Sequence, residues 1–207
     1  QLSLLRAEGR AAVAAFDELV NGRTRDVSLL VGLGQAYLQM ESYGRALSTF
    51  QRARRLAPRN MDIIVGLAFA ETRRGRLGPA RRALQRANRA ISSPRDEARL
   101  AVARGRIDLE YGRMSEAMAE GEAALEKDPH SAEAHFLLAM TVDAQGRDSA
   151  EHLARALQGH GVTPEMLGQM VIHGPREGRC ELAARYMEAS PDGMDARDVE
   201  RVAGRCR

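Results

Sequence analysis

Apolar residues recur along most of this chain at the three- and four-residue intervals of an amphipathic helix, with small residues among them at fixed distances. The stretch 27–58 shows this best, because Gly34, Ala46 and Ala53 interrupt a surface of large and charged side chains. An isolated helix has no need of small residues at fixed places, whereas a helix that contacts another at short range does. The spacing therefore predicts closely packed pairs of helices. The large apolar residues between the small ones are Leu30, Leu33, Tyr37, Tyr43 and Phe50.

The same arrangement returns further along the chain. A second unit starts at Met61, a third at Ala98 and a fourth at Ala132, the last with a shortened second helix. The second unit reproduces the spacing of the first closely. Its matching residues are Ile64, Leu67, Ala68, Leu77, Ala80, Leu84 and Ala87.

Three extra residues around Ser92 shift the frame between the second and third units. Ser93, Pro94 and Asp96 follow, and they supply a capping hydroxyl, a first-turn proline and an acid at the third helical position. This combination predicts that a helix begins at residue 94.

The pattern resembles the tetratricopeptide repeat, whose period is about 34 residues and whose large and small residues fall at these places. The resemblance implies an all-α, right-handed solenoid of four to five helix-turn-helix repeats with capping helices, in which neighbouring repeats bury each other's faces. Arg104 and Gly121 depart from the pattern and predict looser packing in the third unit. We expect one domain over 1–207, with an N-terminal partial repeat at 1–26, repeats at 27–60, 61–94, 98–131 and 132–160, a degenerate repeat at 161–194 and a C-terminal capping helix at 195–207.

The resemblance also implies that the first helix of each repeat lines a concave groove. Family members that grip a C-terminal carboxylate use a set of Lys, Asn and Arg there, and this chain lacks that set. Its corresponding positions are mostly apolar with arginines beside them, which favours a partner segment held by apolar side chains. The alternative is that the valines only pack between neighbouring helices. The predicted groove residues are Val31, Gln35, Leu38, Val65, Phe69, Arg73, Arg99, Val102, Arg106, Leu109, Phe136 and Met140.

Charge is distributed unevenly along the chain. Residues 1–106 contain 20 arginines and 9 acidic residues, and residues 107–207 contain 11 basic and 19 acidic residues. A GC-rich genome accounts for arginine in place of lysine, since Lys127 is the only lysine, but it does not account for the asymmetry. The asymmetry indicates a dipolar molecule that could meet an acidic partner or an anionic membrane surface. We interpret the arginines of 73–89 as a solvated outer face, and with 4% aromatic residues we expect no nucleic-acid binding.

The two cysteines stand near the C-terminal end of the chain. Cys180 occupies a position where the repeat has a small residue, so it could be a buried packing residue. If 178–189 and 196–205 form an antiparallel hairpin that turns at Gly193, Cys180 and Cys206 come together. A disulfide would then staple this end of the solenoid and would imply an oxidising compartment.

Other chemistry is sparse. The five histidines are scattered, the glycines fall at repeat turns and helix crossings, and no catalytic group or metal-ligand set stands out. We therefore expect a non-enzymatic interaction scaffold without a cofactor or metal, which binds a protein segment and neither nucleic acid nor a small-molecule substrate.

In size, repeat number and cysteines, the chain resembles small bacterial pilus-assembly lipoproteins of the Tad-pilus or type IV pilotin kind. This resemblance implies a periplasmic role in assembling an envelope machine, with a lipid anchor ahead of Gln1. The chain begins at Gln1 without Met and without a positively charged leader, which leaves open whether a targeting segment was removed or trimmed. The alternatives are a periplasmic cytochrome c maturation module and a cytoplasmic chaperone or adaptor.

Overall fold

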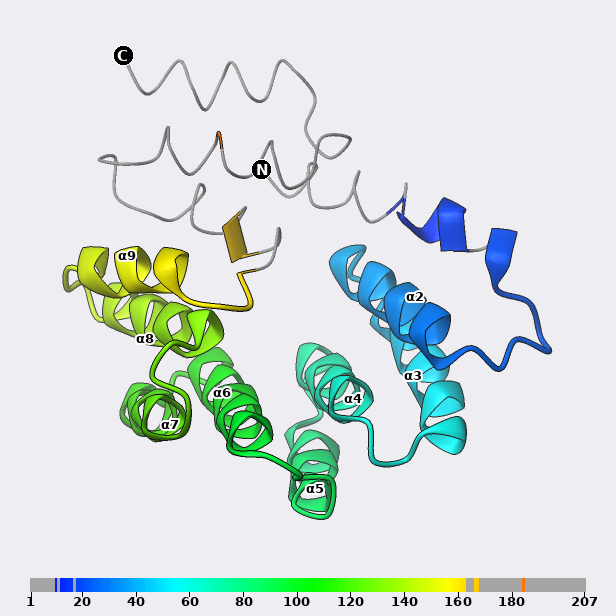
Figure 1. The fold of residues 1–207 in the computed structure, drawn as a ribbon, viewed down its shortest axis with the longest axis horizontal. Helices are drawn as coiled ribbons and strands as arrows, with labels where there is room; N and C mark the ends of the chain where they lie inside the picture. Colours follow the sequence, from blue (N-terminus) through cyan, green and yellow to red (C-terminus); the bar gives the residue numbers. More distant parts are fainter. Residues whose placement is uncertain (1–9, 11, 17, 163–165, 168–183, 185–207) are drawn as a thin grey trace.

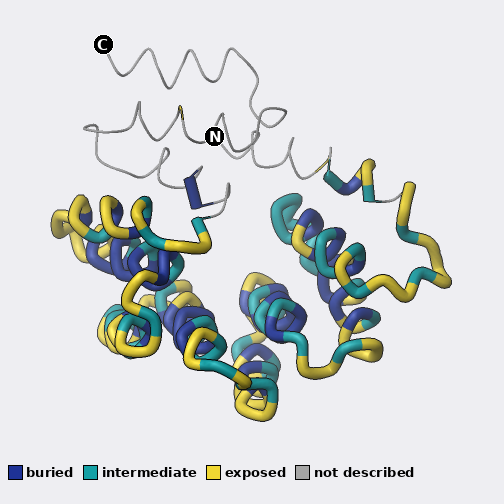
Figure 2. The backbone as a smooth tube through the Cα atoms, in the orientation of Figure 1, coloured by how far each residue is buried: buried dark blue, intermediate teal, exposed yellow. Residues whose placement is uncertain are grey.

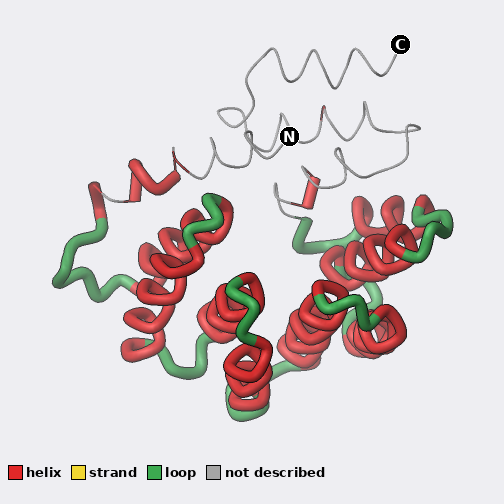
Figure 3. Tube along the Cα trace, turned by 180° about the vertical axis from the view of Figure 1, so that it is seen from behind, coloured by secondary structure: helices red, strands yellow, loops and turns green. Residues whose placement is uncertain are grey.

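The computed structural model describes residues 10, 12–16, 18–162, 166–167 and 184. Over 27–158 the chain forms helices that follow one another in pairs and stack into an arc (Figure 1). Short loops join the helices, as the view from behind shows (Figure 3). The helices are α2 (Val27–Gln39), α3 (Tyr43–Leu56), α4 (Met61–Arg73), α5 (Leu77–Ala87), α6 (Pro94–Glu110), α7 (Met114–Lys127), α8 (Ala132–Ala144) and α9 (Ala150–Gln158).

The first helix of each pair starts at a side-chain cap. Asp26, Asn60, Ser93 and Ser131 each accept a hydrogen bond from a backbone N–H in the first turn of α2, α4, α6 and α8. Ser93 accepts from the N–H of Asp96 at 3.2 Å, with a proline in the first turn, so the helix start predicted from the sequence is confirmed.

The turn inside each pair uses left-handed backbone at one equivalent position. Gly75, Gly112 and Gly146 have φ of 74°, 71° and 70°, and in the first pair Glu41 adopts a φ of 55°. Glycine reaches this region without the steric cost that a Cβ brings. The left-handed backbone of this turn therefore explains why three of the four pairs have glycine at this position.

Large side chains occupy the space that small residues leave. A Cβ at Gly34 would lie 2.7 Å from the ring of the fully buried Phe50, and one at Gly66 would lie 2.5 Å from the same ring. The side chain of Leu138 fills the corresponding space at Gly121, where a Cβ would lie 2.6 Å from its Cδ2. The looser packing predicted around Gly121 is therefore wrong, because a leucine of the next helix replaces the missing volume.

The seam between the second and third pairs differs from the others. Helix α5 contacts α6 less extensively than α3 contacts α4 or α7 contacts α8, while the first helices α4 and α6 contact each other. The inserted residues lie in the connection between Ala87 and Pro94, where they lengthen the path from α5 to α6. This part of the arc therefore depends more on the contact between α4 and α6.

None of the helices in the described ranges is long and apolar enough to cross a membrane.

Candidate functional site on the inner face

The predicted groove residues come from α2, α4, α6 and α8. In the middle of the arc, α4 and α6 lie on the inner side while α5 and α7 lie on the outer side, where more of the residues are exposed (Figures 1 and 2). Seven apolar residues of the predicted set are half-buried, so each keeps part of its side chain accessible. We call these seven the inner strip. They are Val31, Leu38, Val65, Phe69, Leu109, Phe136 and Met140.

Val102 behaves differently from the rest of the predicted set. It is only 4% exposed and packs in a core cluster with Ala98, Ala101, Ala124 and Ala134. The sequence left open the alternative that the valines only pack between neighbouring helices, and Val102 is such a packing residue. We therefore omit Val102 from the surface that could contact a partner.

Three side-chain pairs connect α4 to α6 across the seam. Each pair joins residues 37 positions apart, which is the repeat period of about 34 plus the three inserted residues. The contacts therefore lie in register, with each residue facing its counterpart in the next repeat. The pairs are Asp62 with Arg99, Phe69 with Arg106, and Arg73 with Glu110.

The outer two pairs of this seam are ionic. Arg99 forms an ion pair with Asp62 at the start of the two helices. At their other end, Nη1 of Arg73 lies 2.7 Å from Oε1 of Glu110, and Nε of Arg73 donates to the hydroxyl of Tyr43 at 3.1 Å. Burial lowers the pKa of Arg73, but the hydrogen bond to Tyr43 and the attraction of Glu110 outweigh burial and raise the pKa overall.

The middle pair is a cation–π contact. The guanidinium carbon of Arg106 lies 4.7 Å from the centroid of the Phe69 ring, and Arg106 is exposed. The three arginines of the predicted groove thus differ in their surroundings. Arg73 and Arg99 each face a carboxylate of the neighbouring first helix, so they are poorly placed to attract an anionic ligand. Arg106 contacts the ring of Phe69.

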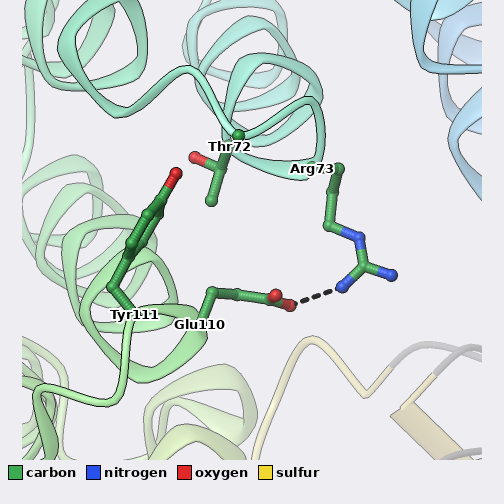
Figure 4. A pocket seen from close by; sticks show the side chains of 5 residues that line it. Thr72, Arg73, Glu110 and Tyr111 are labelled. Atoms are coloured by element: carbon green, nitrogen blue, oxygen red, sulfur yellow. Dashed lines mark hydrogen bonds and ion pairs between the residues drawn. The ribbon is translucent and has the colours of Figure 1, made fainter.

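A hollow of about 250 Å³ lies where α4 and α6 end (Figure 4). It is lined by Thr72, Arg73, Gly75, Glu110 and Tyr111. Tyr111 and Thr72 line one part of the hollow, and the Arg73–Glu110 ion pair lines another. The hydroxyl of Thr72 already donates to the carbonyl of Ala68 at 2.8 Å, so it is satisfied within the fold. The hollow therefore offers space and an ion pair rather than a nucleophile beside a base.

Sequence reasoning missed Glu110 and Tyr111 at this hollow. The signal for Glu110 was present, because it stands at the position in the third unit that Arg73 occupies in the second. For Tyr111, which is 38% exposed at the C-cap of α6, no signal in the sequence distinguished it from other turn residues.

Two histidines meet between α8 and α9. The ring centroids of His135 and His152 are 5.9 Å apart, and each Nδ1 is buried without a hydrogen-bond partner. Burial lowers the pKa of both imidazoles, and the hydrogen bond between His135 and the carbonyl of Pro129 opposes that effect only in part. The two come from different helices, so inspection of one helix face could not pair them. No group of three or more metal-ligating side chains is present within the described ranges.

Cys180 and Cys206 lie outside the described residues, as do most of the degenerate repeat and the C-terminal capping helix. Their predicted pairing stays a prediction.

No protein-family model matches this chain, and no curated protein matches it. Solved structures do match. TTC0263, a thermophilic tetratricopeptide-repeat protein of Thermus thermophilus, shares 20% identity with a TM-score of 0.54 over 86% of this chain and 98% of its own. A monomeric IFIT1 mutant solved with Gppp-AAAA gives 16% identity and a TM-score of 0.57, over 96% of this chain and 46% of its own. The Cut9–Hcn1 hetero-tetramer of the APC/C gives 15% identity and a TM-score of 0.54, over 99% of this chain and 41% of its own. These likenesses show the fold, which is an all-α solenoid of tetratricopeptide repeats.

Proposed function

We propose that this tetratricopeptide-repeat solenoid is a non-enzymatic scaffold that binds a segment of a partner protein across the inner strip. The observation that carries the proposal is the row of half-buried apolar side chains on successive first helices, among them Phe69 and Met140. Apolar side chains that remain partly accessible on one face of a protein often mark a site of interaction. The paired charges of Arg73 and Arg99 support a partner recognised by apolar side chains rather than by an acidic tail.

The test is capture of a partner from the organism that makes the protein, with quantitative mass spectrometry of cross-linked complexes. We expect Phe69→Glu combined with Met140→Glu to abolish capture while the helical circular dichroism stays unchanged, because two carboxylates would be desolvated against apolar anchors.

The chain offers a matched control for this variant. Gln51 and Gln85 are exposed residues of α3 and α5, the second helices of the first two pairs. Gln51→Glu with Gln85→Glu adds the same charge on helices that contribute no residue to the inner strip, so it should leave capture intact. Equal capture by both double variants would place the binding surface away from the inner strip.

For the cellular role, our proposal is assembly of a bacterial envelope machine of the Tad or type IV pilus kind, with the protein in the periplasm and held near the membrane by a lipid. Its support is the resemblance in size, repeat number and cysteines. A cytochrome c maturation module or a cytoplasmic adaptor is the alternative.

The thiol state of the cysteines tests this placement. Protein expressed from its full gene would be denatured without reductant, alkylated and weighed intact, and its peptides mapped. A joined Cys180–Cys206 peptide would support an oxidising compartment. Two free thiols would contradict the staple and favour the cytoplasmic adaptor.

A further inference from the structure

Helix α5 and the turns beside it carry charge of a single sign. Residues 74–89 contain six arginines and no acidic residue, and all six arginines are exposed. A surface of mixed sign has little net field, whereas a surface of one sign attracts oppositely charged partners. We call the six residues the α5 arginine cluster. They are Arg74, Arg76, Arg81, Arg82, Arg86 and Arg89.

Most of this charge is not neutralised within the fold. Nε of Arg76 lies 3.6 Å from Oε2 of Glu71. Nη2 of Arg81 lies 3.7 Å from Oδ1 of Asp108, which also pairs with Arg113. The side chains of the other four arginines have no ion pair or hydrogen bond among the described residues. The cluster is therefore solvated and has charge available for an anionic ligand.

The arginines in the middle of α5 point away from the core. Ala80, Leu84 and Ala87 form the buried side of the helix. Arg82 and Arg86 are four positions apart and share one face, which at ~3.6 residues per turn lies opposite that buried side. Helix α5 is on the outer side of the arc, and the inner strip lies on the other side (Figure 1). A ligand can therefore reach these arginines without entering the inner face.

The chemistry of the cluster favours an anionic lipid surface over a protein or a nucleic acid. The core of a protein interface is apolar, but every exposed residue of 74–89 is Arg, Gly, Gln or Asn. The same range has no aromatic residue on which bases could stack. An anionic bilayer requires neither feature, because charge attraction alone holds arginines near its headgroups and a guanidinium binds phosphate oxygens in pairs.

The next outer helix carries the opposite sign. Glu116, Glu122 and Glu126 of α7 are exposed. Lys127, the only cation of α7, lies 3.0 Å from Glu97. An anionic surface would therefore attract α5 and repel α7, which determines the side on which the molecule would lie.

We infer that the α5 arginine cluster binds the solenoid to a bilayer that contains anionic phospholipid. Arg82 and Arg86 contact the headgroup phosphates, and the inner strip faces away from the bilayer, where a partner segment can reach it. The inference goes beyond the proposed function and does not rest on it, since the cluster and the inner strip share no residue.

The test is partition of the purified full chain onto sedimented vesicles of phosphatidylcholine, with or without about one third phosphatidylglycerol. We expect binding to the anionic vesicles only, and the binding should weaken as salt shortens the Debye length below about 10 Å. Each arginine near an anionic surface strengthens binding about fivefold, so Arg82→Gln with Arg86→Gln should weaken it about 25-fold. Both residues are exposed, so this variant should keep the wild-type circular dichroism.

Arg23→Gln with Arg25→Gln provides the matched control. Both arginines are exposed in the loop that leads into α2, away from α5, so this variant loses the same charge elsewhere on the molecule (Figure 1). It should weaken vesicle binding by about twofold at most, because charges more than a Debye length from the bilayer are screened. Equal losses in the two double variants would mean that net charge drives binding, and would overturn the inference.

Three further outcomes would also overturn the inference. The first is equal binding to neutral and anionic vesicles, and the second is binding to neither. If a DNA duplex binds wild type but not Arg82→Gln with Arg86→Gln, while vesicles do not bind, the cluster belongs to a nucleic-acid site. The Phe69→Glu with Met140→Glu variant should bind anionic vesicles as wild type does, so loss of partner capture and loss of vesicle binding are measured separately.

Discussion

The ring of Phe50 occupies the space that a side chain at Gly66 would need. A Cβ at Gly66 would lie 2.5 Å from Cζ of Phe50, and Phe50 is fully buried, so the ring has little room to retreat. Phe50 comes from α3 and Gly66 from α4, so this contact fixes how closely the first repeat approaches the second.

Gly66→Ala should therefore destabilise the protein by about 1–3 kcal/mol, because one added methyl group in a close-packed core forces side chains out of their rotamers. Urea unfolding followed by circular dichroism measures the change in the free energy of unfolding.

Gly44 provides the control for that substitution. It is an exposed residue of α3, and a Cβ there would meet nothing within 4 Å. Gly44→Ala should leave stability unchanged or raise it by up to about 1 kcal/mol, because alanine has the higher helix propensity. Equal effects at Gly66 and Gly44 would contradict the close contact with Phe50.

Arg52 anchors the loop that leads into α2. Its Nη2 donates to the carbonyl of Asn21 at 2.6 Å and also to the carbonyl of Thr24. Arg52→Ala should cost about 1–3 kcal/mol and should raise the rate of amide hydrogen exchange in 21–30, because two carbonyls lose a charged donor. Arg55→Ala, at an exposed position of the same helix, should change neither measurement. A similar exchange pattern in both variants would show that the loop does not depend on Arg52.

The two ion pairs of the α4–α6 seam should contribute little to stability. Their side chains are 30–41% exposed, and exposed ion pairs typically contribute about 0–1 kcal/mol. A double-mutant cycle with Arg73→Ala and Glu110→Ala should give a coupling energy in this range that decreases as salt is added. A salt-independent coupling well above about 1 kcal/mol would mean that the pair is shielded from solvent more than its exposure indicates.

The fold could be predicted because its determinants are local and periodic. The glycine and alanine positions mark where helices cross, and Ser93 with Pro94 marks the start of α6 even though the frame shifts just before it. Both signals depend on residue size or capping chemistry, which a single sequence displays directly.

The site could be predicted only in outline. The sequence identified which residues lie on the first helices, but not that Arg99 meets Asp62 or that Arg106 meets Phe69, because these contacts depend on the distance and register between two helices. The looser packing predicted around Gly121 is wrong for a related reason. A missing side chain predicts a void, whereas Leu138 from the next repeat fills the space.

The buried histidine pair should make stability depend on pH. His135 and His152 both have a pKa lowered by burial, so the folded protein resists protonation that the unfolded chain accepts near pH 6.5. Charged residues that face the pair include Arg155 and Glu151 of α9 and Glu122 of α7. Arg155 lowers the pKa of both histidines further, whereas Glu151 and Glu122 raise the pKa of His152.

The sign of the effect follows from proton uptake. Well above pH 6.5 neither state is protonated at these sites and their contribution to stability is complete. As the pH falls through 6.5, the unfolded chain binds protons first, so the free energy of unfolding decreases. Urea midpoints measured from about pH 8 to about pH 5 should show this decline, and it should be smaller in a variant carrying His135→Gln and His152→Gln, whatever the stability of that variant at the upper pH. An unchanged slope in the double variant would assign the pH dependence to groups outside the α8–α9 interface.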